Sequence, residues 1–208
     1  MYEVELKVRA AHEPVREALV AREATCLGTV EQNDTYYHAP HRSFAETDEA
    51  LRLRRETREE NVENPEDVEG TEESTAHLTY KGPLVDTTSK TREEAETVVD
   101  DPEAAETIVE ALGFSPAASV RKHRERFALG EYTIALDSVT DVGQFVEIER
   151  TVETEAEIDA ARDGARERLA DLDLDPDDQL RTSYLALLLD ARGTADEQNE
   201  RDGGNNPR

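Results

Sequence analysis

The chain has 208 residues, enough for one domain with a substantial core. It carries 24 lysine and arginine residues against 50 aspartate and glutamate residues, a formal net charge of −26 at pH 7, and only four of the cations are lysines. Such a charge repels nucleic acid and anionic membranes and is typical of adaptation to high salt, so we expect a halophile's protein that binds neither.

The chain contains one cysteine, Cys26, which excludes an internal disulfide and a metal cluster built from cysteines. Cys26 continues the apolar pattern of Val15, Ala18 and Leu19, which predicts a small buried side chain rather than a nucleophile. No apolar run approaches the roughly 18 residues needed to cross a bilayer. We therefore expect a soluble, unexported protein of the reducing cytoplasm.

The first predicted strand lies at the N-terminus, where charged and apolar residues alternate in Glu3-Val4-Glu5-Leu6-Lys7. Alternate side chains of a strand share a face, so both carboxylates and the lysine point the same way. One face thus combines two cation ligands with a fixed positive charge. That combination suits a polyanion bound through a metal.

The elements that follow are mainly strands, with helices inserted between them. The patterns predict a helix over 13–25 that ends near Gly28, a strand over 29–38, a loop over 39–48, strands over 50–54, 77–81 and 91–99, and a stop at Gly82-Pro83. Residues 57–75 are acidic, with almost no large apolar side chain. They cannot bury enough surface to order themselves, which predicts a mobile insertion.

The C-terminal half begins with a helix that opens at Asp101-Pro102 and is closed by Gly113. The remaining patterns predict a hairpin of Ser119–Leu129 with Tyr132–Asp137, a strand over 144–152, helices over 155–172 and 178–192 with an end before Gly193, and a disordered tail over 194–208. No βαβ unit repeats, which argues against Rossmann and TIM-barrel folds. No glycine-rich loop is present either, so any bound phosphate must be held by side chains.

Charged residues of both signs recur on one face of almost every predicted strand. This face carries Glu3, Glu5, Lys7, Arg52, Arg54, Thr79, Lys81, Arg92, Glu94, Glu96, Lys122, Arg124, Arg126, Asp137, Glu147 and Glu149. If the sheet closes, the face could line a polar tunnel, which is tolerable only where ions and ligands neutralise it. Arginine and lysine would then bind phosphate oxygens, and the carboxylates would offer hard oxygen ligands to Mg²⁺ or Mn²⁺.

These residues match a known family in order along residues 1–190. The chain resembles the CYTH superfamily of triphosphate tunnel metalloenzymes, which includes class IV (CyaB-type) adenylate cyclases, thiamine triphosphatases and inorganic tripolyphosphatases. The matching segments are Glu3-Val4-Glu5-Leu6-Lys7, Asp48-Glu49-Ala50-Leu51-Arg52-Leu53-Arg54, Leu78-Thr79-Tyr80-Lys81-Gly82-Pro83, Arg92-Glu93-Glu94-Ala95-Glu96, Lys122-His123-Arg124, Leu136-Asp137-Ser138-Val139 and Gly143-Gln144-Phe145-Val146-Glu147-Ile148-Glu149.

The resemblance implies an α+β fold in which a closed eight-stranded antiparallel β-barrel forms a tunnel with helices outside, as one domain over 1–193. It implies one or two divalent cations, Mg²⁺ or Mn²⁺, for which the metal candidates are Glu3, Glu5, Asp137, Glu147 and Glu149. The triphosphate would be bound by Lys7, Arg52, Arg54, Lys81, Arg92, Lys122 and Arg124, of which Lys7, Arg52, Arg54 and Lys81 are the catalytic candidates.

Several polar-face residues keep a second interpretation. Glu94 and Glu96 are either metal ligands or ion-pair partners that hold the basic residues, while Lys90 and Arg126 are expected at the periphery. Tyr184 is expected to pack in the core of the last helix.

The function implied is that of a class IV adenylate cyclase, which converts ATP to cyclic AMP and pyrophosphate. Such cyclases carry a His-Phe pair followed six residues later by a second Phe, whereas this chain has Tyr36-Tyr37 and then Phe44. A tripolyphosphatase, a thiamine triphosphatase and a non-catalytic polyphosphate-binding module therefore remain alternatives. The expected partner is a nucleoside or inorganic triphosphate, and the protein could be a monomer or a homodimer.

Overall fold

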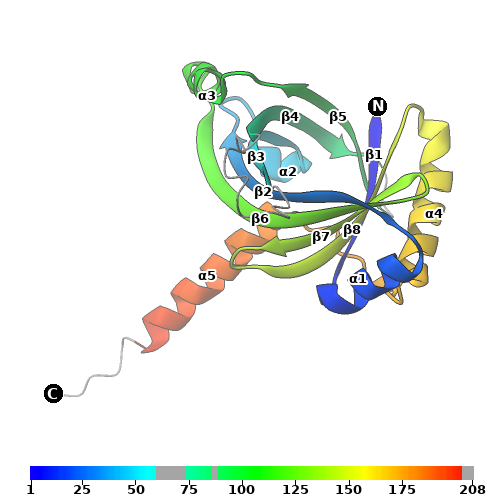
Figure 1. Cartoon of the computed structure of the whole chain (residues 1–208). Coiled ribbons are helices and arrows are strands. Elements are labelled where there is room, and N and C mark those ends of the chain that lie inside the picture. The colour runs from blue at the N-terminus through cyan, green and yellow to red at the C-terminus, as the bar shows by residue number, and fades with distance from the viewer. Residues whose placement is uncertain (60–73, 86–88, 203–208) are drawn as a thin grey trace, which may run out of the picture.

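The computed structural model describes residues 1–59, 74–85 and 89–202 (Figure 1). Eight antiparallel strands close into a barrel in the order β1-β5-β4-β3-β2-β6-β7-β8. The strands are β1 (Tyr2–Arg9), β2 (Thr25–His38), β3 (Ala50–Glu59), β4 (Ser74–Leu84), β5 (Lys90–Val98), β6 (Ser115–Leu129), β7 (Tyr132–Val139) and β8 (Gly143–Val152). The predicted closed eight-stranded barrel with helices outside is confirmed.

Helices α1, α2 and α3 connect strands, whereas α4 and α5 follow the last strand; the helices lie outside the barrel wall, with α1 and α4 beside β1 and β8 in Figure 1. They are α1 (His12–Ala21), α2 (Phe44–Thr47), α3 (Pro102–Ala111), α4 (Ile158–Asp171) and α5 (Tyr184–Asp202), with 3₁₀ turns at Glu155–Glu157 and Pro176–Asp178. As predicted, α3 is capped by Asp101, whose carboxylate accepts from the Ala104 N–H, and Gly113 follows with a φ of +94°. None of the described helices is both long enough and apolar enough to cross a membrane.

The main hydrophobic core lies between the outer face of the barrel and two helices. Leu6, Ile134 and Ile148 project outward from the wall and are fully buried against α1 and α4. A smaller cluster places Val109 of α3 against Leu53 on the other side of the wall. Since burial of an aliphatic side chain stabilises by about 1.5–3 kcal/mol, these outward faces hold the barrel together.

Strand register brings the charged faces together inside the barrel. Glu5 lies opposite Glu149 and Lys7 opposite Glu147 across the β1–β8 pair. Arg124 lies opposite Asp137 across the β6–β7 pair. Directly opposed residues of antiparallel strands share a face, so the alternation seen in single strands continues around the interior.

One end of the interior is apolar. Val120, Val139 and Phe145, which continue the inward faces of β6, β7 and β8, pack with Tyr184 and Leu188 of α5. We call these five residues the apolar plug. The segment before α5 is tied to β1 by a hydrogen bond from the Leu180 N–H to the Lys7 carbonyl, 2.7 Å long. The first turn of α5 is thereby fixed at the end of the barrel.

The predicted boundary between the first helix and the second strand is wrong. Helix α1 ends at Ala21 rather than at residue 25, and β2 already begins at Thr25. Gly28 does not end a segment but lies in β2 at a break in its pairing with β6, with a φ of +103° that suits glycine. Cys26 therefore belongs to the strand and is exposed, not buried as predicted.

Strands β3 and β4 also extend beyond their predicted limits. Thr57 pairs with Ser74, so both ends of the predicted insertion at 57–75 belong to strands, because backbone pairing outweighs the acidic composition. Residues 60–73, the rest of that insertion, lie outside the described residues. The predicted loop at 39–48 contains α2.

Helix α5 runs through Gly193, where the sequence predicted its end, and continues to Asp202. The helical backbone thus includes the first part of the predicted tail at 194–208, and residues 203–208 lie outside the described part of the chain.

Gly164 gives a test of how α4 packs on the barrel. A Cβ at this position would overlap the hydroxyl of Tyr132, which donates to the Ala161 carbonyl over 3.1 Å. We expect Gly164→Ala to lower the melting temperature, because overpacking costs about 1–3 kcal/mol and exceeds the gain of about 1 kcal/mol in helix propensity.

The matched control is Gly193→Ala in α5, where nothing lies within 4 Å of the added Cβ. This variant should raise the melting temperature slightly, through helix propensity alone. Thermal unfolding of both proteins measures the difference, and an equal rise in the two would contradict the described packing of α4.

Candidate functional site

The barrel encloses a cavity of about 500 Å³, a size usual for small-molecule sites. Its walls carry three of the chain's four lysines, Lys81, Lys90 and Lys122, together with five arginines. In a chain with a net charge of −26, this concentration of cations in one enclosed space is the strongest sign of an anionic ligand.

Arg124 is the centre of the most deeply buried charge network. Its guanidinium binds both oxygens of Asp137, each at 2.6 Å, and also contacts Glu147 and Glu149. Lys122 lies 3.3 Å from Asp137, which is fully buried. These cations keep the pKa of Asp137 below its usual value against the opposing effect of burial.

Asp34 of β2 is a second buried carboxylate, and it pairs with two arginines of β3. It accepts two hydrogen bonds of 2.7 Å from Arg54 and lies 3.7 Å from Arg52. Asp34 is 2 % exposed, and despite its burial these arginines hold its pKa below the usual range. The two arginines are therefore fixed in place before any ligand binds.

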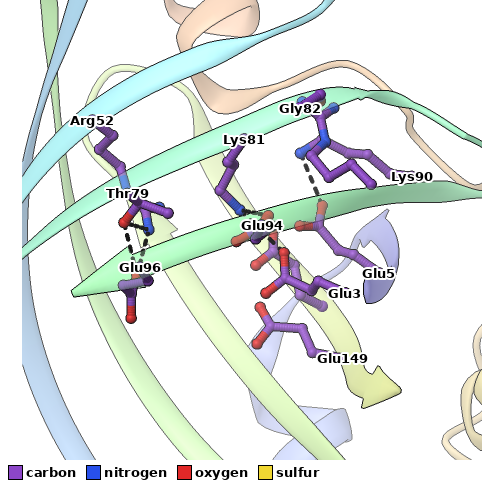
Figure 2. A network of polar contacts seen from close by, with 12 residues as sticks. Glu3, Glu5, Arg52, Thr79, Lys81, Gly82, Lys90, Glu94, Glu96 and Glu149 are labelled. Atoms are coloured by element: carbon purple, nitrogen blue, oxygen red, sulfur yellow. Dashed lines mark hydrogen bonds and ion pairs between the residues drawn. The ribbon is translucent and has the colours of Figure 1, made fainter. Parts of the chain in front are cut away.

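Strands β4 and β5 contribute further pairs, shown in Figure 2. Lys81 lies between two carboxylates, 3.1 Å from Glu3 and in contact with Glu94. Burial and the nearby charge of Glu3 raise the pKa of Glu94 to about 7, with Lys81 opposing the shift. Glu94 is thus placed as an ion-pair partner of a cation.

Other cavity cations are paired in the same way. Arg52 lies 3.5 Å from Glu96 and donates to Thr79, as Figure 2 also shows. Arg92 donates to the Asp48 carbonyl over 2.6 Å and to its carboxylate over 3.2 Å.

Three of the five predicted metal ligands converge. Carboxylate oxygens of Glu5, Glu147 and Glu149 lie within 4.8 Å of one another. Glu5 and Glu147 are buried, at 5 % and 3 % exposure. The other two candidates lie outside this cluster: Glu3 is beside Lys81, and Asp137 is beside Arg124, which also contacts Glu147 and Glu149.

The chemistry of this carboxylate cluster fits a divalent cation. Burial raises the pKa of Glu149 to about 8, and the charges of Glu147, Glu3 and Glu5 add to the shift while Arg124 opposes it. Arg124 already contacts Glu147 and Glu149, and Lys90 lies 3.0 Å from Glu5, so Glu149 is the member of the cluster whose ionisation a further cation would favour. Oxygen ligands of this kind are those that Mg²⁺ and Mn²⁺ prefer.

The predicted phosphate-binding residues divide into two groups. Arg52, Arg54, Lys81, Arg92, Lys122 and Arg124 line the cavity. Lys7 is 1 % exposed and is absent from the described cavity wall. Its ammonium lies 4.2 Å from the ring centre of Tyr184 and within 3.7 Å of the Glu5 and Glu147 carboxylates. Burial and the charge of Lys90 lower the pKa of Lys7.

Sequence analysis missed four residues of the site. Lys90, predicted to be peripheral, lies 3.0 Å from Glu5 inside the cavity, and Arg126, predicted to be peripheral too, also lines it. Asp34 could have been found from the alternation of Gln32, Asp34 and Tyr36 in its strand. Tyr184 carried no such signal, because its position over Lys7 depends on where α5 meets the barrel.

Comparison with known proteins gives a family match over most of the chain. The CYTH domain family matches residues 1–184. A protein of Methanocaldococcus jannaschii named "Putative adenylate cyclase" is 34 % identical over 188 residues, which cover 90 % of this chain and 98 % of that protein.

Solved structures have the same fold. A protein from Pyrococcus horikoshii OT3 is 35 % identical, with a TM-score of 0.79 over 90 % of this chain and 98 % of its own. A Hippeastrum protein named "Putative adenylyl cyclase", for which a dominant triphosphatase activity is stated, superposes with a TM-score of 0.58. It is 15 % identical and covers 91 % of this chain and 95 % of its own, a likeness of fold alone.

The carboxylate cluster can be tested by metal binding. We expect Glu5→Gln to weaken Mn²⁺ binding at least tenfold, because a neutral amide removes one charged ligand from the cluster. Isothermal titration calorimetry measures the affinity. Glu96→Gln is the matched control, since Glu96 lines the same cavity outside the cluster and should leave the affinity unchanged. Equal losses in both variants would contradict the assignment.

The raised pKa of Glu149 predicts how metal binding depends on pH. Below a pH of about 8 the Glu149 carboxyl holds a proton that a cation must displace. Mn²⁺ affinity should therefore rise between pH 6.5 and pH 9, with proton release on binding at pH 7. Titration in two buffers of different ionisation enthalpy measures the protons released. Glu149→Gln should abolish that release, and its persistence in this variant would rule out Glu149 as the source.

Proposed function

The chain belongs to the CYTH domain family, and from that premise we propose that it is a divalent-metal-dependent adenylate cyclase that converts ATP to cyclic AMP and pyrophosphate. The observation that carries the proposal is the cavity inside the barrel, where three of the four lysines and five arginines face a cluster of three carboxylates. This arrangement can hold a chain of phosphates and a cation side by side.

Mg²⁺ or Mn²⁺ would be held by Glu5, Glu147 and Glu149, whose oxygens converge within 4.8 Å. When bound, the cation neutralises charge on the phosphate oxygens. The remaining carboxylates support the basic residues. Asp137 and Asp34 hold Arg124 and Arg54 by paired hydrogen bonds, so that the cationic groups keep their positions when the ligand arrives.

The basic residues bind and orient the triphosphate. Guanidinium groups such as Arg52 and Arg54 suit bidentate contact with phosphate oxygens, and Lys81 adds a compact charge. In the cyclase reaction the ribose 3′-oxygen attacks the α-phosphorus and pyrophosphate leaves. Fixing the chain for in-line attack and stabilising charge on the departing pyrophosphate are the contributions that these residues can make.

A triphosphatase is the second candidate, in which water attacks the terminal phosphorus. Two observations favour keeping it. Tyr36 lines the cavity at the position where class IV cyclases carry histidine. A triphosphatase activity is also stated for the Hippeastrum protein that has this fold. Both reactions use the same phosphate-binding side chains and differ in which phosphorus is attacked.

Product analysis separates the two reactions. The protein is incubated in high salt with Mg²⁺ or Mn²⁺ and, separately, with ATP, tripolyphosphate and thiamine triphosphate. We expect cyclic AMP and pyrophosphate from ATP. Release of inorganic phosphate as the main product would favour a triphosphatase instead. Tight binding with no turnover of any of the three would overturn the enzymatic proposal and leave a polyphosphate-binding module.

Substitution of Lys81 tests directly whether the basic residues of the cavity bind the triphosphate. Lys81→Ala should lower kcat/KM about 100-fold or more, because a preorganised charge next to the phosphates is lost. Arg168→Ala, which removes a half-buried cation from α4 outside the cavity, serves as the control and should stay close to the wild-type rate. Circular dichroism checks that both variants fold, and an unchanged rate in folded Lys81→Ala would exclude this residue from the site.

A further inference from the structure

Tyr184 is the residue of the apolar plug that borders the charged cavity. Tyr184 lines the cavity with its neighbours Ser183 and Leu185, yet only 7 % of its surface is exposed. Its ring packs against Phe145 of the plug, with ring centres 5.0 Å apart. The side chain therefore presents one surface to the phosphate-binding space and another to the closed end of the barrel.

The ring also lies over two of the chain's four lysines. The ammonium of Lys7 is 4.2 Å from the ring centre and that of Lys122 is 5.1 Å away, both within the range of cation–π attraction. Lys122 lines the cavity, whereas Lys7 is absent from its described wall. Tyr184 thus leaves one lysine within reach of a ligand and covers the other.

The hydroxyl of Tyr184 has no hydrogen-bond partner within the described residues, although it is buried. An unpaired buried polar group costs about 1–3 kcal/mol, and a ligand atom that completes the hydrogen bond would recover that free energy. Burial, with the nearby charges of Glu147 and Asp137, raises the pKa of Tyr184 well above its usual value. The hydroxyl consequently remains protonated and can donate to an anionic oxygen.

The start of α5 adds a second feature that suits an anion. The first turn lies at the cavity wall, and its position is fixed because the Ser183 hydroxyl accepts from the Ala186 N–H over 3.1 Å. The N-terminus of a helix carries partial positive charge and favours phosphate groups. The hydroxyl and the helix N-terminus therefore lie at the same end of the cavity.

We propose that Tyr184 is a specificity-determining residue that ends the phosphate-binding space, donates a hydrogen bond to the last phosphate of the bound chain and limits the chain to three phosphates. The inference rests on the proposed function, since it assumes that the cavity binds a triphosphate. It adds the reason why longer chains are rejected: the ring occupies the space through which a fourth phosphate would reach Lys7.

Binding of linear phosphates tests the proposal. The affinities of tripolyphosphate and tetrapolyphosphate are measured by calorimetry in Mg²⁺ for the wild-type protein, Tyr184→Phe and Tyr184→Ala. We expect the wild type to prefer tripolyphosphate. In Tyr184→Ala, tetrapolyphosphate should gain at least tenfold relative to tripolyphosphate, because the opened space exposes Lys7. Tyr184→Phe keeps the ring, so it should lose about tenfold in tripolyphosphate affinity without any gain for the longer chain.

The control is Leu189→Ala, which truncates a half-exposed side chain of the same helix away from the cavity and should behave as the wild type. If Tyr184→Ala does not fold, the nearly isosteric Tyr184→Phe still tests the hydroxyl. An unchanged chain-length preference in folded Tyr184→Ala, or an unchanged affinity in Tyr184→Phe, overturns the inference alone. If the wild type binds neither phosphate, the proposed function fails and the inference fails with it.

Discussion

Neutralisation of buried charge is the constraint on which this structure depends. Taking an ion out of water costs several kcal/mol, and the barrel interior holds cations such as Arg124 and Lys122 at 6 % and 4 % exposure. They are tolerable because each lies against a carboxylate: Asp137 binds both, as Asp34 binds Arg54 and Arg52. The interior is thus a set of ion pairs that surrounds a space into which a ligand of matching charge can fit.

The acidic residues of the interior consequently have two structural roles, as partners of specific cations and as members of a carboxylate cluster. Asp34, Asp137 and Glu94 are paired with specific cations and hold them in position. Glu5, Glu147 and Glu149 contact Lys90 and Arg124 as well, but their oxygens also converge within 4.8 Å, and burial together with the neighbouring carboxylates raises the pKa of Glu149 to about 8. An added cation relieves the second group, whereas an added phosphate chain interacts with the cations held by the first. This division supports the proposal that one cavity binds metal and phosphate together.

The strongly acidic exterior makes the location of the cations informative. A chain with a net charge of −26 repels anions at long range, so an anionic substrate is attracted only where cations are concentrated and partly shielded from water. The barrel wall provides that shielding on all sides, and the apolar plug closes one end.

The sequence by itself determined the strands, their charged faces and most of the cationic residues of the cavity, because side chains of a strand alternate with a fixed period of two and few other surfaces would collect lysine in so acidic a chain. It could not determine which carboxylates pair with cations and which converge. Glu3 and Glu5 are equivalent in the local pattern, but β1 lies between β5 and β8, so Glu3 meets Lys81 while Glu5 joins Glu147 and Glu149. Nor could it place Tyr184 over Lys7, since that contact joins residues from opposite ends of the chain. Strand order and the docking of α5 decided both, because they set which charges share the low-dielectric interior.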